Sequence, residues 1–463
     1  SWQNTDNIVA VADFDGDGKP DVSRVSNAGV VRVHLNTTTS GTIDAGSFDS
    51  GADFPLYNSV TYSLRAADFD GDGKMDIVGL TNSGIVSFLK NTSTGTGNIS
   101  FAAKVDLPVT SGMANMDVAD FDGDGKIDIV CNRGGAYYSS QPIIYLNTGS
   151  IGTISFSSTG STLTNGGQKM TIGDIDGDGK MDIITSGGSV YIYINGSTPG
   201  SLSFSSMSPS TTSSKFISVA DFDSDGDNDL MDENGTFFEN TYSGSGGISS
   251  SDFTSIASSY SMSNSIVGRV SNGDFNTDGK VDYFHIDHNS SSKTYMLLNA
   301  ISGPISSSSF TGYTTYRHGK GRKTICDFDG DGKNDILTSD YNTNTFTIVR
   351  NNIGETIYYY PLYSGYVYYH TFWDGAPSDL FTDSDYALRL TKSGVSEFNI
   401  GGSNWAVANK IVFSDANLNL GWYNFELSGV AEGISASAYI KTSGNGFLKQ
   451  TVSTSVKSFG IGN

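Results

Sequence analysis

The sequence predicts an all-β protein, a seven-bladed β-propeller followed by a second β domain. Two observations carry this prediction: an acidic nine-residue motif recurs seven times, and four strand-sized segments accompany each copy. The composition agrees, because 56 of the 463 residues are glycine, aromatic residues reach 12% and charged residues only 16%. Such a profile is typical of many short strands joined by turns.

The acidic motif follows the pattern D-x-D-x-D-G-x-x-D, and its first copy reads DFDGDGKPD. We call the seven copies loops 1 to 7; they occupy residues 13–21, 68–76, 120–128, 174–182, 221–229, 274–282 and 327–335. Their first residues are separated by 55, 52, 54, 47, 53 and 53 residues. A period near 50 residues indicates a propeller or another array of similar units.

Each repeat contains four apolar segments of strand length. One leads into the acidic loop and a second leaves it. The third ends on an asparagine: Asn36, Asn91, Asn147, Asn195, Asn240, Asn299 and Asn351. The fourth begins near an aromatic residue: Phe48, Phe101, Phe156, Phe204, Phe253, Phe310 and Tyr358. Four such strands form one small antiparallel sheet, and seven sheets packed radially bury faces that each sheet alone would leave in water.

The residue before each acidic loop is small, which predicts a crowded position near the axis of the ring. These residues are Ala12, Ala67, Ala119, Gly173, Ala220, Gly273 and Cys326. Cys326 and the other cysteine, Cys131, follow no metal-type spacing, so we expect both to be buried free thiols.

The spacing of the acidic loop predicts a metal site. Positions 1, 3 and 5 offer carboxylates, position 7 a backbone carbonyl and position 9 a last carboxylate, all converging on one point. A hard cation with six to eight oxygen ligands fits, which favours calcium over magnesium or zinc. Glycine at position 6 permits the left-handed turn around the ion.

The predicted ligands follow from these positions in each loop. They are Asp13, Asp15, Asp17, Lys19 and Asp21; Asp68, Asp70, Asp72, Lys74 and Asp76; Asp120, Asp122, Asp124, Lys126 and Asp128; Asp174, Asp176, Asp178, Lys180 and Asp182; Asp221, Asp223, Asp225, Asp227 and Asp229; Asp274, Asn276, Asp278, Lys280 and Asp282; and Asp327, Asp329, Asp331, Lys333 and Asp335. About seven structural calcium ions would reduce the net charge of −22 to about −8.

Metal-free turns, EF-hands and dockerins fit the motif less well. A metal-free Asp-Gly turn would account for one copy, but not for seven copies with the same ligand spacing. An EF-hand or a dockerin needs flanking helices, and an EF-hand also needs glutamate at position 12, where loop 1 has Arg24.

The repeats over residues 1–362 resemble FG-GAP/VCBS repeats, the calcium-bearing blades of integrin α-subunit propellers and of many bacterial surface proteins. The resemblance implies seven blades, an ion between the first and second strands of a blade, and calcium loops on one face. It also implies that ligands meet the opposite face, through the connections between strands 2 and 3 and between blades. We expect the longest of these connections to expose Tyr137 and Tyr138, our candidate ligand contacts.

Two departures from that family matter. Integrins carry the acidic loop in only some blades, whereas all seven repeats have it here. Loops 5 and 6 are altered at Ser224, Asp227, Asn276 and Thr277, so we expect these two sites to bind calcium more weakly.

Residues 363–463 again read as short strands. They resemble a LamG/concanavalin A-like jelly roll at Ala387–Leu390, at Gly421–Tyr423 and at Phe459–Asn463. The resemblance implies a β-sandwich, which we expect to be incomplete, so that the chain would be a fragment of a longer surface protein.

Charge and motifs exclude several function classes. The acidic balance of 27 basic to 49 acidic residues argues against nucleic-acid binding, and no apolar run could span a membrane. No catalytic constellation stands out, because the regularly placed aspartates are assigned to calcium. We therefore expect no enzyme and disfavour a hydrolase.

Two hypotheses about function remain. Calcium sites of this kind suit the millimolar calcium outside cells, which favours an extracellular location. The leading hypothesis is a secreted, calcium-stabilised adhesin of the bacterial kind, which presents propeller loops to a glycan or protein ligand. The alternative is a lectin-like carbohydrate-binding module of a larger polysaccharide-processing enzyme.

Overall fold

The computed structural model describes two stretches of the chain to different extents. Beyond residue 351 it describes only the backbone of the strands β28–β38. Within residues 9–351 the description omits 26–28, 39–42, 44–45, 58–60, 82, 134–140, 168, 188, 210–216, 233–235, 245–246, 258–269, 287–292, 302–304, 307–308, 318–322 and 341–344. The candidate ligand contacts Tyr137 and Tyr138 therefore lie outside the described residues.

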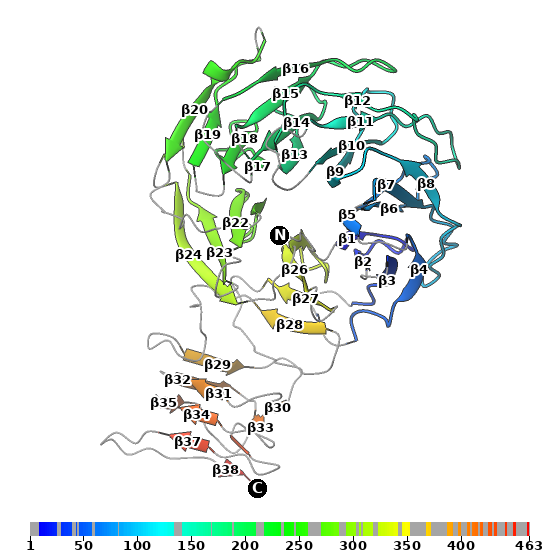
Figure 1. The fold of residues 1–463 in the computed structure, drawn as a ribbon. Coiled ribbons are helices and arrows are strands. Elements are labelled where there is room, and N and C mark those ends of the chain that lie inside the picture. The colour runs from blue at the N-terminus through cyan, green and yellow to red at the C-terminus, as the bar shows by residue number, and fades with distance from the viewer. Residues whose placement is uncertain are drawn as a thin grey trace.

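Seven four-stranded sheets, each built from consecutive strands, are arranged around a common centre (Figure 1). Sheets 1 and 2 contain β1 (Val9–Ala12), β2 (Asp21–Val25), β3 (Val30–His34), β4 (Ala52–Pro55), β5 (Thr61–Ala67), β6 (Asp76–Thr81), β7 (Ile85–Leu89) and β8 (Val105–Pro108). Sheets 3 and 4 contain β9 (Met113–Ala119), β10 (Asp128–Arg133), β11 (Ile143–Tyr145), β12 (Ser161–Thr162), β13 (Lys169–Gly173), β14 (Asp182–Ser186), β15 (Tyr191–Asn195) and β16 (Phe204–Met207).

Sheets 5 to 7 complete the ring. Sheet 5 contains β17 (Ile217–Ala220), β18 (Asp229–Asp232), β19 (Thr236–Asn240) and β20 (Phe253–Ala257), with the 3-10 turn η1 (Ser250–Asp252) before β20. Sheets 6 and 7 contain β21 (Val270–Gly273), β22 (Asp282–Ile286), β23 (Lys293–Asn299), β24 (Phe310–Arg317), β25 (Lys323–Cys326), β26 (Asp335–Asp340), β27 (Thr345–Arg350) and β28 (Val367–Thr371). The predicted seven-bladed propeller is confirmed.

The landmarks of the repeat fall where the sequence places them. In six sheets the asparagine that ends the third strand pairs antiparallel with the predicted aromatic residue, as Asn36 does with Phe48 and Asn195 with Phe204. The seventh sheet differs, because its fourth strand β28 runs parallel to β27 and lies beyond residue 362, where we expected the propeller to end. Tyr358, predicted to begin that strand, is outside the described residues.

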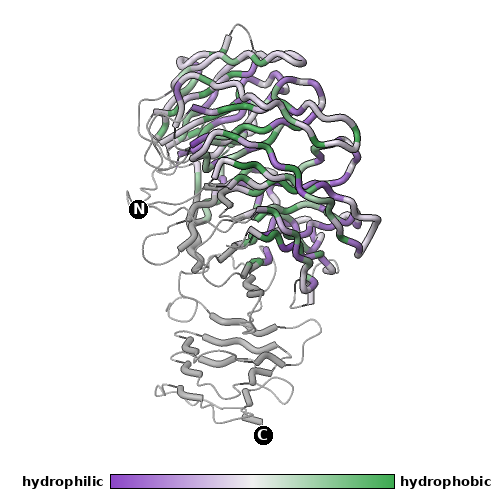
Figure 2. The backbone as a smooth tube through the Cα atoms, turned by 45° about the vertical axis from the view of Figure 1, so that its right-hand side comes forward, coloured by the Kyte–Doolittle hydropathy of each residue, from purple (hydrophilic) through white to green (hydrophobic). Residues whose placement is uncertain are grey.

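The core of the ring lies between neighbouring sheets. The side chain at position 2 of each acidic loop is no more than 2% exposed and anchors a cluster shared by two adjacent sheets: Phe14, Phe69, Phe121, Ile175, Phe222, Phe275 and Phe328. Hydrophobic positions run along the strands in Figure 2. The hydrophobic effect therefore holds each sheet against the next rather than holding any sheet alone.

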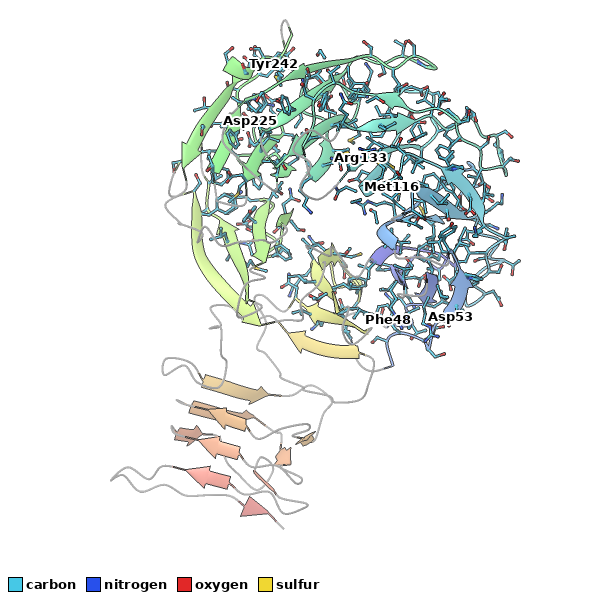
Figure 3. The ribbon with its side chains drawn as sticks, viewed as in Figure 1. Phe48, Asp53, Met116, Arg133, Asp225 and Tyr242 are labelled. Carbon is cyan, nitrogen blue, oxygen red and sulfur yellow. The ribbon has the colours of Figure 1, made fainter. Side chains whose placement is uncertain are left out.

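Among the described strands none is shared between sheets 7 and 1, and contacts between these two sheets close the ring. Phe48, labelled in Figure 3, meets the rings of Phe328 and Phe346 edge-on, with centroids 6.1 and 5.6 Å apart. Val9 and Val22 belong to the same buried cluster. Sheets 7 and 1 are thus joined as the other neighbouring sheets of the ring are.

The asparagine at the end of each third strand ties its sheet to the preceding one. In sheet 2, Asn91 Nδ2 donates to the carbonyl of Phe14 in sheet 1 (2.8 Å) and to that of Met75 in its own sheet (2.9 Å). Equivalent intersheet bonds are donated by Asn36 to Phe328, Asn147 to Phe69, Asn195 to Phe121, Asn240 to Ile175, Asn299 to Phe222 and Asn351 to Phe275. These seven residues, the interblade asparagines, form a hydrogen-bonded circuit around the ring.

The small residue before the loop is required most clearly in sheet 4. A Cβ atom added to Gly173 would lie 2.6 Å from Cγ1 of Val219 on the neighbouring sheet. Crowding at this repeated position was predicted. Cys131 is buried, Cys326 is partly buried, and both are free thiols.

The described strands after β28 pair in parallel. They form the sheets β29–β32–β35, β30–β33–β36–β38 and β31–β34–β37. Their bounds are Ala387–Thr391 (β29), Glu397–Asn399 (β30), Trp405–Val407 (β31), Lys410–Ser414 (β32), Asn417–Asn419 (β33), Phe425–Leu427 (β34), Val430–Glu432 (β35), Ile440–Lys441 (β36), Leu448–Gln450 (β37) and Ile461–Gly462 (β38). A jelly roll pairs its strands antiparallel, so the sandwich expected for residues 363–463 is not shown. Among the described residues no helix is long and apolar enough to cross a membrane.

Candidate metal centre

Each acidic loop connects the first and second strands of a sheet and folds around its own first aspartate. In loop 1, Asp13 Oδ1 accepts hydrogen bonds from the N–H groups of Gly16 (2.8 Å) and Asp17 (3.1 Å), and Oδ2 accepts one from Gly18 (2.8 Å). Loops 2, 3 and 7 repeat this set at Asp68, Asp120 and Asp327. The turn therefore has a fixed shape before any ion is considered.

That shape requires left-handed backbone at positions 4 and 6. In loop 1 these are Gly16, with φ of 78°, and Gly18, with φ of 86°. Position 4 is Ser224 in loop 5 and Thr277 in loop 6, and they adopt φ of 63° and 59°. Side-chain-bearing residues are strained in this region, a β-branched one most. The altered loops thus keep the common geometry at some cost in stability.

The carboxylates of one loop converge as the spacing predicts. Ligand-capable oxygens lie within 4.8 Å of one another in several described loops. The groups are Asp13, Asp15 and Asp17; Asp68, Asp70 and Asp76; Asp120, Asp122 and Asp128; Asp174, Asp176 and Asp182; and Asp221, Asp223 and Asp225. We call positions 1, 3 and 5 the mouth carboxylates and position 9 the inner carboxylate.

Several mouth oxygens are buried without a hydrogen-bond partner among the described residues. They are Oδ1 of Asp174, Asp176, Asp223, Asp274 and Asp329. A buried carboxylate oxygen without a donor is costly unless a cation is present. The candidate ligand atoms of the described groups are all carboxylate oxygens, which fit calcium and do not suit zinc.

The inner carboxylate has a different environment. In loop 4, Asp182 Oδ2 accepts the N–H of Ile175 and Oδ1 accepts the N–H of Asn195, both at 2.7 Å. Asp21, Asp76, Asp128, Asp229, Asp282 and Asp335 make the same pair of bonds, and all seven are at most 1% exposed. This residue joins the loop to the end of the third strand, a role that ligand spacing alone does not reveal.

Burial makes the charge on the inner carboxylate unfavourable. It raises the pKa to about 7 in Asp21, Asp76, Asp128, Asp182 and Asp229, to about 6 in Asp282 and to about 8 in Asp335. The two N–H bonds lower the pKa, as a bound cation would. The inner carboxylate therefore suits two roles at once. One lone pair of each oxygen accepts a backbone N–H, and another is left for an ion.

The next sheet covers the mouth in some loops. Asp15 Oδ2 accepts the N–H of Gly97 (2.6 Å), and Asp122 Oδ2 accepts that of Gly200 (2.8 Å). Each donor lies between the third and fourth strands of the following sheet. Position 3 is thus buried from two sides.

The side chains of the remaining predicted ligands, at position 7 and at Asn276, make contacts that do not point to a metal site. Among the lysines of position 7, Lys126 and Lys180 pair with position 5 of their own loops at 3.0 Å, whereas Lys74 donates to the carbonyl of Ser93. Asn276 bonds to Asp278 of its own loop. The assignment of all these residues as calcium ligands stays a prediction.

Comparison with known proteins identifies the repeat. Residues 13–79 and 68–131 match the model of the FG-GAP-like repeat. No curated protein matches the chain.

Comparison with solved structures finds matches of low identity. A lectin from Burkholderia pseudomallei, BP39L, is 10% identical over 74% of this chain and 95% of its own, with a TM-score of 0.49. Two structures of BBS1N in complex with ARL6DN, soaked with mercury and with lead, are 11% and 12% identical over 72% of this chain and 88% of theirs, with TM-scores of 0.41 and 0.42. At such values the likeness carries no argument about function. The chain contains FG-GAP-like repeats within a seven-bladed β-propeller.

Proposed function

We propose that this protein is a non-catalytic binding scaffold, stabilised by calcium, that acts outside cells at a surface. Its rigid ring would present the connections between strands and between blades to a glycan or protein ligand. The carboxylates that recur in the acidic loops would bind calcium and so stabilise the ring, and would take no part in catalysis.

The observation that carries the calcium role is the set of buried mouth oxygens without a partner among the described residues, at Asp174, Asp176, Asp223, Asp274 and Asp329. Four of these oxygens belong to positions 1 and 3 of loops 4, 5 and 6, and a metal-free turn would leave them unsatisfied. A single divalent ion in each of these three mouths would satisfy them.

Calcium-binding modules that work outside cells bind with Kd of about 10⁻⁴ to 10⁻³ M. At millimolar calcium each site would then add about 0.4 to 1.4 kcal/mol to the free energy of unfolding. Several sites of this strength would make the ring stable outside cells, and much less stable where calcium is micromolar or lower.

The binding role rests on the fold and stays a proposal. The connections after the second strands fall largely outside the described residues, at 26–28, 134–140, 233–235, 287–292 and 341–344. Tyr137 and Tyr138 remain our candidate contacts, because adjacent tyrosines in a connection of this kind suit a sugar face or a protein interface.

Two measurements on the whole chain test the proposal. Elemental analysis should find several calcium ions per chain, and EDTA should lower the melting temperature; no bound calcium with an unchanged melt would contradict it. Glycan and protein arrays, probed in calcium, should then reveal a ligand whose binding Y137A/Y138A weakens without changing the melt. Binding restricted to one glycan class would instead favour the carbohydrate-binding module of a larger enzyme.

A further inference from the structure

One position outside the nine-residue motif varies strongly among the sheets and reaches the metal loops. It is the residue just before each interblade asparagine. Its seven occupants are Leu35, Lys90, Leu146, Ile194, Glu239, Leu298 and Arg350. Four are apolar, two are basic and one is acidic.

Lys90 places a cation in the mouth of loop 2. Its Nζ donates to Oδ2 of Asp70, lies 3.4 Å from Oδ2 of Asp72, and donates to the carbonyl of Gly152 at 2.8 Å. The Asp70 side chain is fully buried. The ammonium therefore bridges positions 3 and 5 of this loop, where a calcium ion would bind.

Arg350 does the same in loop 7. Its Nε donates to Oδ2 of Asp329, and its Nη2 donates to Oδ2 of Asp331 at 2.7 Å. The Arg350 side chain is only 16% exposed, so the pair is well shielded from solvent. Two different basic side chains at one equivalent position thus bridge the same two carboxylates.

Within the described part of the chain, no cation bridges positions 3 and 5 in the loops with an apolar residue at this position; Lys126 and Lys180 contact position 5 alone. In loops 1 and 3 the Oδ2 atom of position 3 accepts a neutral backbone N–H, from Gly97 and Gly200. In loop 4 both Asp174 and Asp176 keep a buried oxygen without a partner.

Loop 5 carries additional negative charge. Glu239 occupies the position that Lys90 and Arg350 occupy in their own repeats, and its Oε1 accepts the N–H of Ile305 at 3.1 Å. Position 7, a lysine in the other loops, is Asp227 here. Asp223 Oδ1 is buried without a partner among the described residues. The negative charge of this mouth therefore exceeds that of any loop with an apolar or basic neighbour.

We propose that the residue before the interblade asparagine grades the calcium affinity of the seven loops. Lys90 and Arg350 are built-in counter-ions that replace calcium in loops 2 and 7, whereas Glu239 makes loop 5 the tightest calcium site. The inference rests on the calcium binding proposed above. It also replaces the expectation, drawn from Ser224 and Asp227, that loop 5 binds calcium weakly.

The grading has a simple electrostatic cause. A divalent ion that enters loop 2 or 7 must displace a cation already bonded to two of its ligands, or remain beside it and be repelled. An added carboxylate acts in the opposite direction. Charges about 4 Å apart under partial shielding change an affinity by about tenfold or more.

Calcium stoichiometry of the whole chain tests the grading. Equilibrium dialysis against about 10 mM calcium, which is about ten times the weakest expected Kd, with elemental analysis, should find about five ions in the native chain, since Lys90 and Arg350 fill two of the seven loops. K90L/R350L, which installs the residue of loops 1 and 3, should bind about seven. R32L, which removes a cation paired with Asp53 away from the loops, should leave the number unchanged.

Two variants that change the same position in the opposite direction keep the test informative if K90L/R350L fails to fold. L146K should remove about one ion by giving loop 3 the lysine of loop 2, and E239Q should weaken the tightest step of a calcium titration by about tenfold. Seven ions in the native chain, unchanged by L146K, would overturn the grading while leaving calcium binding intact. No ions in any variant would overturn the proposed function itself.

Discussion

The two ends of each acidic loop differ in what satisfies their carboxylates. At the inner end, both oxygens of position 9 accept backbone N–H groups in all seven loops, as at Asp182. At the mouth, buried oxygens of positions 1 and 3 have no partner among the described residues in loops 4 to 7, as at Asp176. One run of aspartates therefore serves two purposes: positions 1 and 9 order the loop and the blade through backbone N–H groups, and the carboxylates together present oxygens to a cation.

The largest effect expected from this difference is that of D182A. It leaves the N–H groups of Ile175 and Asn195 buried without an acceptor. At about 1–3 kcal/mol for each group, the free energy of unfolding should fall by about 2–6 kcal/mol. Denaturant unfolding in EDTA measures it, because the loss should not require calcium. A loss seen only in calcium would mean that the inner carboxylate acts only as a ligand.

Removal of an interblade asparagine should come next. N195A deletes the donors to the carbonyls of Phe121 and Met181, at 3.0 and 3.1 Å. We expect a loss of about 2–4 kcal/mol in denaturant unfolding, with or without calcium. N98A, outside the circuit, is the control and should change stability by less than about 0.5 kcal/mol. Equal effects of the two variants would show that the asparagine circuit does not stabilise the ring.

Relief of backbone strain at position 4 should change the free energy of unfolding by a smaller amount and should raise it. T277G replaces a β-branched residue at φ of 59° with the glycine found at position 4 of most loops. Thermal or denaturant unfolding should show a gain of about 1 kcal/mol. S224G should gain less, because serine is not β-branched. A loss of stability in both variants would show that the left-handed turn is not strained.

The smallest expected effect belongs to the mouth carboxylates, and it depends on calcium. D176N should not lower stability in EDTA, because burial and then the neighbouring Asp178 raise the pKa of Asp176, so that its charge is unfavourable without a cation. In millimolar calcium it should forfeit most of the stabilisation from one site, about 0.4 to 1.4 kcal/mol. The difference between the melting temperatures in calcium and in EDTA measures this loss. A drop of the same size in both conditions would erase the distinction between mouth and inner end.

Much of the architecture was predictable because it is repeated. The period, the aromatic residue at position 2 of most loops and the glycine at position 6 recur and fix seven sheets with convergent carboxylates. The sequence also repeats the interblade asparagine, but its bond to the carbonyl of the preceding blade joins residues far apart in the chain, as from Asn91 to Phe14, and no local spacing encodes it.

The features that the sequence did not reveal are likewise long-range. Lys90 and Asp70 are separated by 20 residues and meet only because strands 2 and 3 of one sheet pair. The double bonding of the inner carboxylate has the same origin. Strand β28 lies beyond the expected boundary and pairs in parallel with β27, which no turn signal in the sequence indicated.

Long-wavelength anomalous diffraction from crystals grown in calcium tests the central claim most directly, because it locates calcium and reports its occupancy. Peaks are predicted among positions 1, 3 and 5 of loops 1, 3, 4, 5 and 6, strongest beside Asp223 and Glu239, and absent where Lys90 and Arg350 lie. Peaks in loops 2 and 7, or no peak in loops 1, 3, 4, 5 and 6 in millimolar calcium, would contradict the claim.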